Sequence, residues 1–160
     1  MSVDPIARPS HVPWPPLLLV ATLVAAWALG RPGGWPLPWP GTDDMPARIV
    51  GGGLGLGGLA LGVWALATFL RAGTQVRPDQ QATKLVTHGP YRRLRNPMYL
   101  AEVMILLGLA ELTHNVWFAL LAPLFGIAVT VLAIIPEERH LAARFGDTYL
   151  AYKERTRRWI

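Results

Sequence analysis

The chain of 160 residues contains no cysteine, and only 16% of its residues are charged. The absence of cysteine excludes disulfide bonds, thiolate nucleophiles and cysteine-ligated metal sites. The scarcity of charge, together with 52% hydrophobic residues and a mean hydropathy of +0.31, is typical of membrane proteins. We therefore expect one integral membrane domain over residues 1–160, with a flexible N-terminal segment at residues 1–13.

Uncharged runs define four candidate membrane spans. Residues 49–70 and 116–135 carry no formal charge over 22 and 20 positions, enough to cross a hydrocarbon core of about 30 Å. Residues 14–30 form a run of 17, at the lower limit for a span, and residues 98–112 are interrupted by Glu102 and Glu111. We expect an all-α helical bundle of four transmembrane helices, the last two forming a helical hairpin that turns at residues 113–115. A cytoplasmic C-terminal helix, opened by Pro136, is expected to follow.

The distribution of basic residues predicts the orientation. Twelve of the 15 lysines and arginines lie in two segments, residues 71–95 and 139–158. Cytoplasmic loops of membrane proteins are enriched in Lys and Arg, so both segments are expected on the cytoplasmic side. Both segments can be cytoplasmic only if an even number of spans lies between them. A bundle of four spans meets this condition, and a bundle of three does not. We expect a bacterial inner-membrane protein whose polar site faces the cytoplasm.

Glycines are concentrated at the start of the second predicted span. Gly53 to Gly58 formally matches the dinucleotide-binding pattern G-x-G-x-x-G, but no strand precedes it and no acidic residue follows about 20 positions later. The pairs Gly51/Gly55 and Gly58/Gly62 have the small-residue spacing that lets two helix backbones approach closely. This segment is therefore interpreted as a helix-packing surface.

Two polar segments interrupt or follow the apolar runs, and they look like the halves of one site. Residues 88–99 read His-Gly-Pro-Tyr-Arg-Arg-Leu-Arg-Asn-Pro-Met-Tyr, in which Asn96 is a natural N-cap for a helix that begins at Pro97. Residues 136–160 form the second segment. On a helix from Pro136, one semi-apolar face is expected, with Gly146 as a candidate break; its members are Leu141, Phe145, Tyr149 and Tyr152.

Several polar residues have structural interpretations as well. His88, His114 and His140 share no metal-ligand spacing, so we expect no metal site. The basic segments lack the aromatic interleaving of nucleic-acid binders, so membrane lipids are the expected partner of Arg92, Arg93, Arg157 and Arg158. Glu102, a carboxylate inside a predicted span, is either a functional residue or the partner of Arg95.

The two polar segments together resemble the isoprenylcysteine carboxyl methyltransferase-like family, small integral-membrane enzymes that use S-adenosylmethionine. The resemblance covers residues 71–160, which would form the catalytic region behind the first two spans in residues 14–70. Asn96 and Ala101 depart from the His and Gly usual in the enzymes that act on prenylated cysteine. The Asn-Pro-Met-Tyr of residues 96–99 is closer to what phospholipid N-methyltransferases show. The resemblance is carried by Gly89-Pro90-Tyr91-Arg92-x-x-Arg95-Asn96-Pro97-x-Tyr99, by Glu137-Glu138-x-x-Leu141-x-x-x-Phe145-Gly146-x-x-Tyr149-x-x-Tyr152, and by the closing Arg-Arg-Trp-Ile.

The resemblance implies a role for each matching residue. The loop before the third span would form much of the S-adenosylmethionine cavity, and the Glu137-Glu138 pair would hold polar groups of this cofactor. Glu138 and Arg144 would act as the catalytic residues that orient the acceptor. The loop residues implied in cofactor binding are His88, Gly89, Pro90, Tyr91, Arg95, Asn96, Pro97 and Tyr99.

The chemistry of the residues agrees with methyl transfer but leaves the acceptor open. Methyl transfer from a sulfonium needs neither a covalent intermediate nor a metal; it needs alignment in a site that excludes water. The expected acceptor is a lipophilic or membrane-partitioned small molecule or lipid. Arg144 could hold a carboxylate for O-methylation, and Glu138 could accept a proton from an amine for N-methylation. A non-enzymatic transporter or scaffold subunit is the alternative, although its long spans would be expected to carry charge.

Overall fold

A computed structural model describes residues 14–42, 44–73 and 84–160 of the chain. The described part is all-α and has no strand beyond one isolated bridge, which confirms the predicted fold class. The expectation of a flexible segment at residues 1–13 lies outside the described residues. The helices are α1 (Trp14–Gly30), α2 (Met45–Arg71), α3 (Pro97–Thr113), α4 (Val116–Val129), α5 (Ile135–Phe145) and α6 (Asp147–Glu154), with a 3-10 turn at Gly89–Arg92 and a π-helical turn at Thr130–Ile134.

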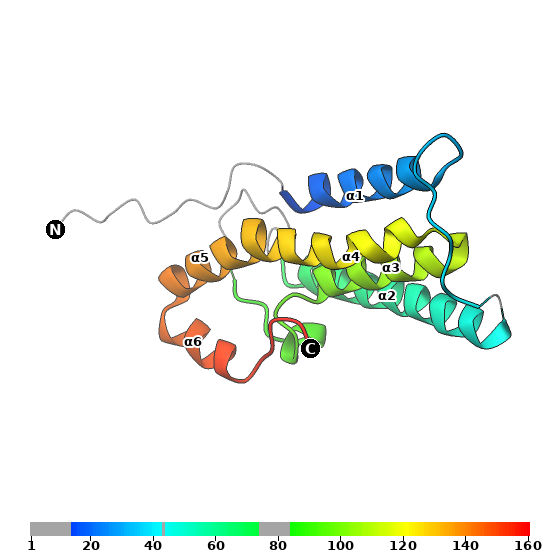
Figure 1. Ribbon diagram of the computed structural model, residues 1–160. Coiled ribbons are helices and arrows are strands. Elements are labelled where there is room, and N and C mark those ends of the chain that lie inside the picture. Colours follow the sequence, from blue (N-terminus) through cyan, green and yellow to red (C-terminus); the bar gives the residue numbers. More distant parts are fainter. Residues whose placement is uncertain (1–13, 43, 74–83) are drawn as a thin grey trace.

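The first four helices run alternately up and down in one bundle (Figure 1). Helix α2 packs against α3, α3 against α4, and α4 against α1. One end of the bundle carries the α1–α2 loop and the α3–α4 turn. The other end carries the loop before α3, helices α5 and α6, and the C-terminus (Figure 1). The two polar segments of the sequence thus meet at a single end of the bundle.

Side-chain caps define the turns at the opposite end. Asp44 caps α2, its Oδ1 accepting a hydrogen bond from the backbone N–H of Ala47 at 2.9 Å. Asn115 caps α4 through Oδ1 and ties the hairpin to α1 by donating from Nδ2 to the carbonyl of Ala26 at 2.8 Å. His114 takes up the left-handed conformation that ends α3 (φ 49°). The predicted helical hairpin with its turn at residues 113–115 is therefore confirmed.

Glycines bring α2 and α3 into backbone contact. A β-carbon added to Gly108 of α3 would lie 2.8 Å from the backbone N of Gly55, and one added to Gly58 would lie 2.8 Å from the carbonyl O of Ala101. Real β-carbons do not approach other atoms so closely, so both positions require glycine. The predicted role of this stretch in helix packing is confirmed.

The long helices leave their apolar side chains uncovered. Met45–Arg71 and the continuous helix Val116–Phe145 are long and apolar enough to cross a membrane, whereas Pro15–Gly30 is a shorter apolar helix. Only 17% and 28% of the most apolar windows of the two long helices are buried. A core helix of a soluble protein would bury most of such a window, so this surface suits lipid. Exposed apolar residues on the two long helices include Ile49, Val50, Leu56, Val63, Leu70, Leu120, Leu124, Ile127 and Val131.

The C-terminal helix does not begin at Pro136, contrary to the sequence-based expectation. Helix α4 continues through the π-helical turn Thr130–Ile134 directly into α5, so Pro136 lies within an unbroken helix. Proline is accommodated there because the wider π-helical turn already disrupts the regular hydrogen bonding. The expected break at Gly146 is confirmed: this residue has φ +50°, and α6 leaves in a new direction.

The close approach of α2 and α3 gives a stability prediction. Gly108→Ala should destabilise the bundle by about 1–3 kcal/mol, because the backbone of α2 must move away from the new methyl group. Gly53→Ala is the matched control, since a β-carbon there meets nothing within 4 Å. Thermal unfolding in detergent micelles would measure both variants. Equal stability of the two would contradict the packing described.

Candidate active site

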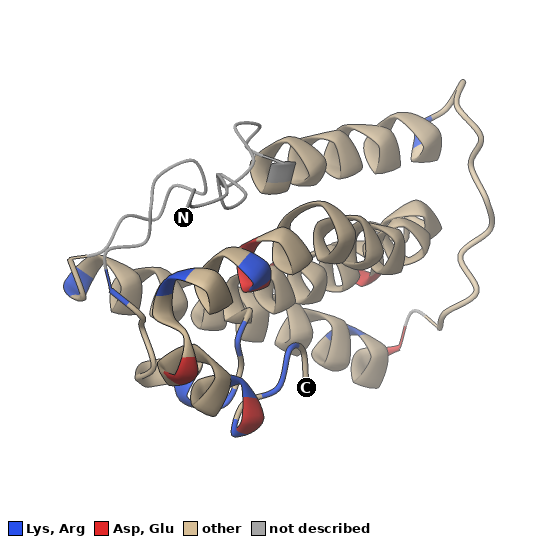
Figure 2. Cartoon of the chain, turned by 90° about the vertical axis from the view of Figure 1, so that its left-hand side faces the viewer, with Lys and Arg blue, Asp and Glu red and all other residues tan. Residues whose placement is uncertain are grey.

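Charged residues gather where the loop before α3, helices α5 and α6, and the C-terminal segment meet. Figure 2 shows blue and red segments concentrated over this end of the molecule, while the helices of the bundle are almost entirely tan. The C-terminal segment runs back beside the loop before α3 (Figure 1). The candidate site is built from these four pieces of chain.

Backbone hydrogen bonds join the C-terminal segment to the loop before α3. The N–H of Arg95 donates to the carbonyl of Arg157 at 2.7 Å, and the N–H of Arg157 donates to the carbonyl of Arg93 at 2.9 Å. These bonds form the isolated parallel bridge between Leu94 and Arg157. Asn96 adds a side-chain bond from Nδ2 to the carbonyl of Arg158 at 3.1 Å.

Asn96 does not make the helix-capping hydrogen bond that the sequence predicts. It occupies the N-cap position before Pro97, as expected, but its side chain makes no cap hydrogen bond. The amide side chain is used instead to hold the C-terminal segment, 62 residues away in the sequence. The local sequence identifies the cap position, but it gives no sign of the distant backbone carbonyl that binds the Asn96 side chain instead.

The carboxylate of Glu138 links three parts of the site. Its Oε1 accepts hydrogen bonds from Nε of Arg95 at 3.0 Å and from Nε of Arg158 at 3.1 Å. Its Oε2 accepts from Nη2 of Arg158 at 2.7 Å. Glu138 is 8% exposed, so these charge-assisted bonds lie largely away from water. The hydrogen bond with Glu138 raises the pKa of the Arg158 guanidinium above its usual value.

Arg95 donates hydrogen bonds to three protein groups. Besides Glu138, its guanidinium donates from Nη1 to the carbonyls of Lys153 at 3.0 Å and Thr156 at 2.5 Å. These bonds fix the end of α6 and the segment after it against the start of α3. Arg95 thus does not pair with Glu102, and that alternative from the sequence is wrong.

Tyr91 anchors the loop before α3 to the rest of the protein. Its ring packs against Phe69 of α2 with centroids 5.1 Å apart, and its carbonyl accepts a hydrogen bond from the Tyr152 hydroxyl at 2.8 Å. Burial raises the pKa of Tyr91 above its usual range, and the nearby Glu137 and Tyr152 raise it further. Gly89 allows this docking, because it has φ +62° and a β-carbon there would lie 2.7 Å from Oγ1 of Thr68.

The side chain of Glu137 points in a different direction from that of Glu138. Its side chain is accessible to solvent but is closely surrounded by protein, and this burial, with the neighbouring Glu138, raises its pKa. It lies within electrostatic range of Tyr91 and Tyr99. Three side chains nearby have buried polar atoms with no hydrogen-bond partner among the described residues: Glu102 (Oε2), one turn after Tyr99, His140 (both ring nitrogens), one turn after Glu137, and Tyr149 (the hydroxyl). Burial raises the pKa of Tyr149, which therefore keeps its proton as a hydrogen-bond donor. Unsatisfied buried polar atoms of this kind are typical of a site that binds a polar ligand.

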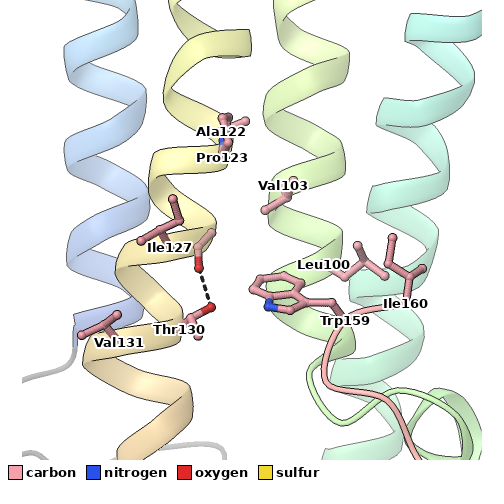
Figure 3. Close-up of a pocket in the computed structure, with 10 residues that line it drawn as sticks. Leu100, Val103, Ala122, Pro123, Ile127, Thr130, Val131, Trp159 and Ile160 are labelled. Carbon is pink, nitrogen blue, oxygen red and sulfur yellow. Dashed lines mark hydrogen bonds between the residues drawn. The ribbon is translucent and has the colours of Figure 1, made fainter.

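An apolar groove of about 390 Å³ lies between α3 and α4, where the last two residues of the C-terminal segment line it. In Figure 3 the Trp159 ring reaches between the two helices. The hydroxyl of Thr130 donates to the carbonyl of Gly126 at 2.7 Å, so it does not offer its proton to the groove. The other residues that line the groove are Leu100, Val103, Ala122, Pro123, Ile127, Val131 and Ile160.

Comparison with known proteins identifies the family. The model of the phospholipid methyltransferase family matches residues 46–148, more than half of the chain. The chain belongs to the phospholipid methyltransferase family. Family membership confirms the resemblance found in the sequence and indicates a membrane methyltransferase.

Two curated proteins are similar to parts of this phospholipid methyltransferase family member. A nickel-cobalt-cadmium resistance protein, NccN, of Alcaligenes xylosoxydans xylosoxydans is 32% identical over 77 residues, which are 48% of this chain and 36% of that protein. The chain therefore spans only about a third of that relative. An uncharacterized protein of Haemophilus influenzae is 34% identical over 65 residues, 39% of this chain and all of that protein. No solved structure shows significant similarity to the chain.

The residues predicted to form the methyltransferase site fall into several groups. Those near the unsatisfied polar atoms are Tyr91, Tyr99 and Glu137. Arg95, Asn96 and Glu138 instead hold the C-terminal segment, and Gly89, Pro90 and Pro97 shape the loop and the start of α3.

Two predicted residues lie at the margin of the site. His88 is exposed and precedes the 3-10 turn. Arg144 is exposed near the end of α5, with its guanidinium carbon 5.9 Å from the centre of the Phe145 ring. Arg144 follows Glu137 by seven residues, about 10 Å along a helix. Arg158, assigned to lipid headgroups in the sequence, is instead the main partner of Glu138; it had no sequence signal beyond its place in the closing Arg-Arg-Trp-Ile.

The Glu138 network gives a second prediction. Glu138→Gln removes a buried charge from two guanidinium groups, so it should cost about 3 kcal/mol of stability and loosen the C-terminal segment. Trypsin cleavage after Arg155 and Arg157 should become faster. Glu154→Gln, an exposed carboxylate of α6, is the control and should change little. Unchanged cleavage in Glu138→Gln would show that the network does not hold this segment.

Proposed function

We propose that the protein is a membrane-embedded methyltransferase that uses S-adenosylmethionine to methylate a lipophilic or membrane-partitioned acceptor. Family membership supports methyl transfer. The observation that carries the cofactor proposal is the pair of buried, unpartnered polar atoms on Glu102 and Tyr149 beside the exposed Glu137. These groups offer carboxylate acceptors and a hydroxyl donor, which fit the charged and polar groups of S-adenosylmethionine.

Each side chain of the proposed site has a role that follows from its surroundings. When bound, S-adenosylmethionine supplies an electrophilic methyl group attached to a sulfonium. Glu137 accepts hydrogen bonds from the polar groups of this cofactor, and the rings of Tyr91 and Tyr99 offer cation–π attraction to a positive charge. Pro90 and Tyr91, the buried residues of the 3-10 turn in this loop, limit the access of water.

Glu138 is proposed to position the site rather than to act on the acceptor. Its carboxylate already accepts three hydrogen bonds from Arg95 and Arg158. Such bonds stabilise the ionised form, so Glu138 is a poor proton acceptor. The direct role that the family resemblance implies for the acidic pair therefore falls to Glu137.

The apolar groove supports a lipophilic acceptor. It opens beside Ile127 and Val131, which are 61% and 57% exposed on a helix apolar enough to cross a membrane. A hydrocarbon chain can therefore enter from the bilayer without passing through water. Amine N-methylation and carboxyl O-methylation both remain within this proposal, with Arg144 as the group that would hold a carboxylate.

Cofactor binding can be measured directly. Calorimetric titration of the detergent-purified protein should detect S-adenosylmethionine and its demethylated product, S-adenosylhomocysteine. Glu137→Gln should lower the affinity by roughly 10- to 150-fold, because a charge-assisted hydrogen bond is worth about 1.5–3 kcal/mol. Glu154→Gln is the control and should bind like the wild type. No binding of either ligand to the wild type at millimolar concentration would refute the proposed function.

We further propose that α1 to α4 all cross the bacterial inner membrane and that the site faces the cytoplasm. The alternating directions of the four helices and the positive charge near the site support this topology. Reporter fusions at Trp39 and after Ile160 test it. The fusion at Trp39 should report the external side and the fusion after Ile160 the cytoplasm, and the reverse result for either would reject the topology.

A further inference from the structure

Glu102 is a carboxylate placed where an apolar side chain would be expected. It lies in the second turn of α3, on a helix whose neighbouring buried residues are Ala101 and Leu106. Its Oε2 atom is buried and has no hydrogen-bond partner in the described part of the chain. A buried carboxylate oxygen left unpaired is unfavourable. Glu111 shares this feature at the far end of α3, so it is the position of Glu102 near Tyr99 and Glu137 that makes it a candidate ligand contact.

The most obvious protein partner for Glu102 is committed elsewhere. Arg95 precedes α3 by two residues, but its Nε donates to Glu138 and its Nη1 to the carbonyls of Lys153 and Thr156. The guanidinium therefore faces the C-terminal segment. Oε2 of Glu102, which has no hydrogen-bond partner in the described part of the chain, is therefore available to a cationic ligand.

The position of Glu102 places it inside the proposed cofactor site. It follows Tyr99 by three residues and so shares its face of α3. Tyr99 lies within electrostatic range of both Glu102 and Glu137, which belong to different helices. A ligand beside the Tyr99 ring would thus have a carboxylate on each of two sides.

We propose that Glu102 recognises the positive charge of the sulfonium, an assignment that rests on the proposed function. The first turn of α3 presents the positive end of the helix dipole, which repels a cation. A carboxylate one turn deeper reverses that repulsion, and its effect is large because little water screens it. Glu102 therefore favours the methyl donor over the uncharged thioether that remains after transfer, and so promotes exchange of product for donor.

The preference between two ligands tests this role without any activity measurement. Titration calorimetry on the detergent-purified protein would compare S-adenosylmethionine, which is cationic at sulfur, with S-adenosylhomocysteine, which is not. Glu102→Gln should weaken binding of S-adenosylmethionine by about tenfold or more, while S-adenosylhomocysteine binding changes less than about twofold. Glu111→Gln is the matched control, because Glu111 also has a buried, unpartnered oxygen on α3 but lies at the other end of the helix.

The outcomes separate this inference from the proposed function. Binding of neither ligand to the wild type would refute the proposed function itself. Binding of both to the wild type, with equal weakening or no change in Glu102→Gln, would refute the role of Glu102 alone. If Glu102→Gln does not fold, Glu102→Asp decides: a retained preference for the sulfonium supports the assignment, and equal weakening for both ligands overturns it.

Discussion

The polar end of this protein depends on one carboxylate held between two guanidinium groups. Glu138 belongs to the long helix Val116–Phe145, Arg95 to the loop before α3, and Arg158 to the C-terminal segment. Among the described residues, the two hydrophobic core clusters come from the bundle and from the contacts around Tyr91, and neither includes a residue of α5, α6 or the C-terminal segment. Tyr149 and Tyr152 of α6 are buried outside these clusters. The ion pairs, the short parallel bridge and the hydrogen bond from Tyr152 to Tyr91 therefore hold the site together. Loss of the Glu138 charge would leave the largely buried Arg95 without its carboxylate partner.

The bundle provides the rigid frame on which this network is placed. Backbone contact between α2 and α3 at Gly55 and Gly108 leaves little freedom for sliding, because packing of small residues requires one register. The start of α3 is thereby fixed relative to the end of α2, where Thr68 meets Gly89. Helix α3 then carries Tyr99 and Glu102 into the interior from a defined position.

The sequence predicted the features that depend on local pattern. Apolar runs indicated the four helices of the bundle, the glycine spacing indicated a close helix pair, and Gly146 indicated the break in the C-terminal region. The choice among distant partners could not be predicted in this way. The sequence indicated Glu102 as a possible partner of Arg95, whereas its actual acceptors are Glu138 and the carbonyls of Lys153 and Thr156, which carry no side-chain signal. Likewise Asn96 occupies a cap position but binds a carbonyl 62 residues away.

Helix geometry explains why the adjacent acidic residues cannot share one task. Consecutive residues on a helix point about 100° apart, so Glu137 and Glu138 necessarily face different surroundings. Glu138 turns to the two arginines and is buried, whereas Glu137 is exposed near Tyr91 and Tyr99. Of these two neighbouring glutamates, Glu138 therefore holds the structure together and Glu137 is a candidate ligand-binding group. Loss of the Glu138 ion pairs would displace Glu137 as well. Substitutions at either residue can therefore impair binding, but for different physical reasons. Only stability measurements distinguish the two cases.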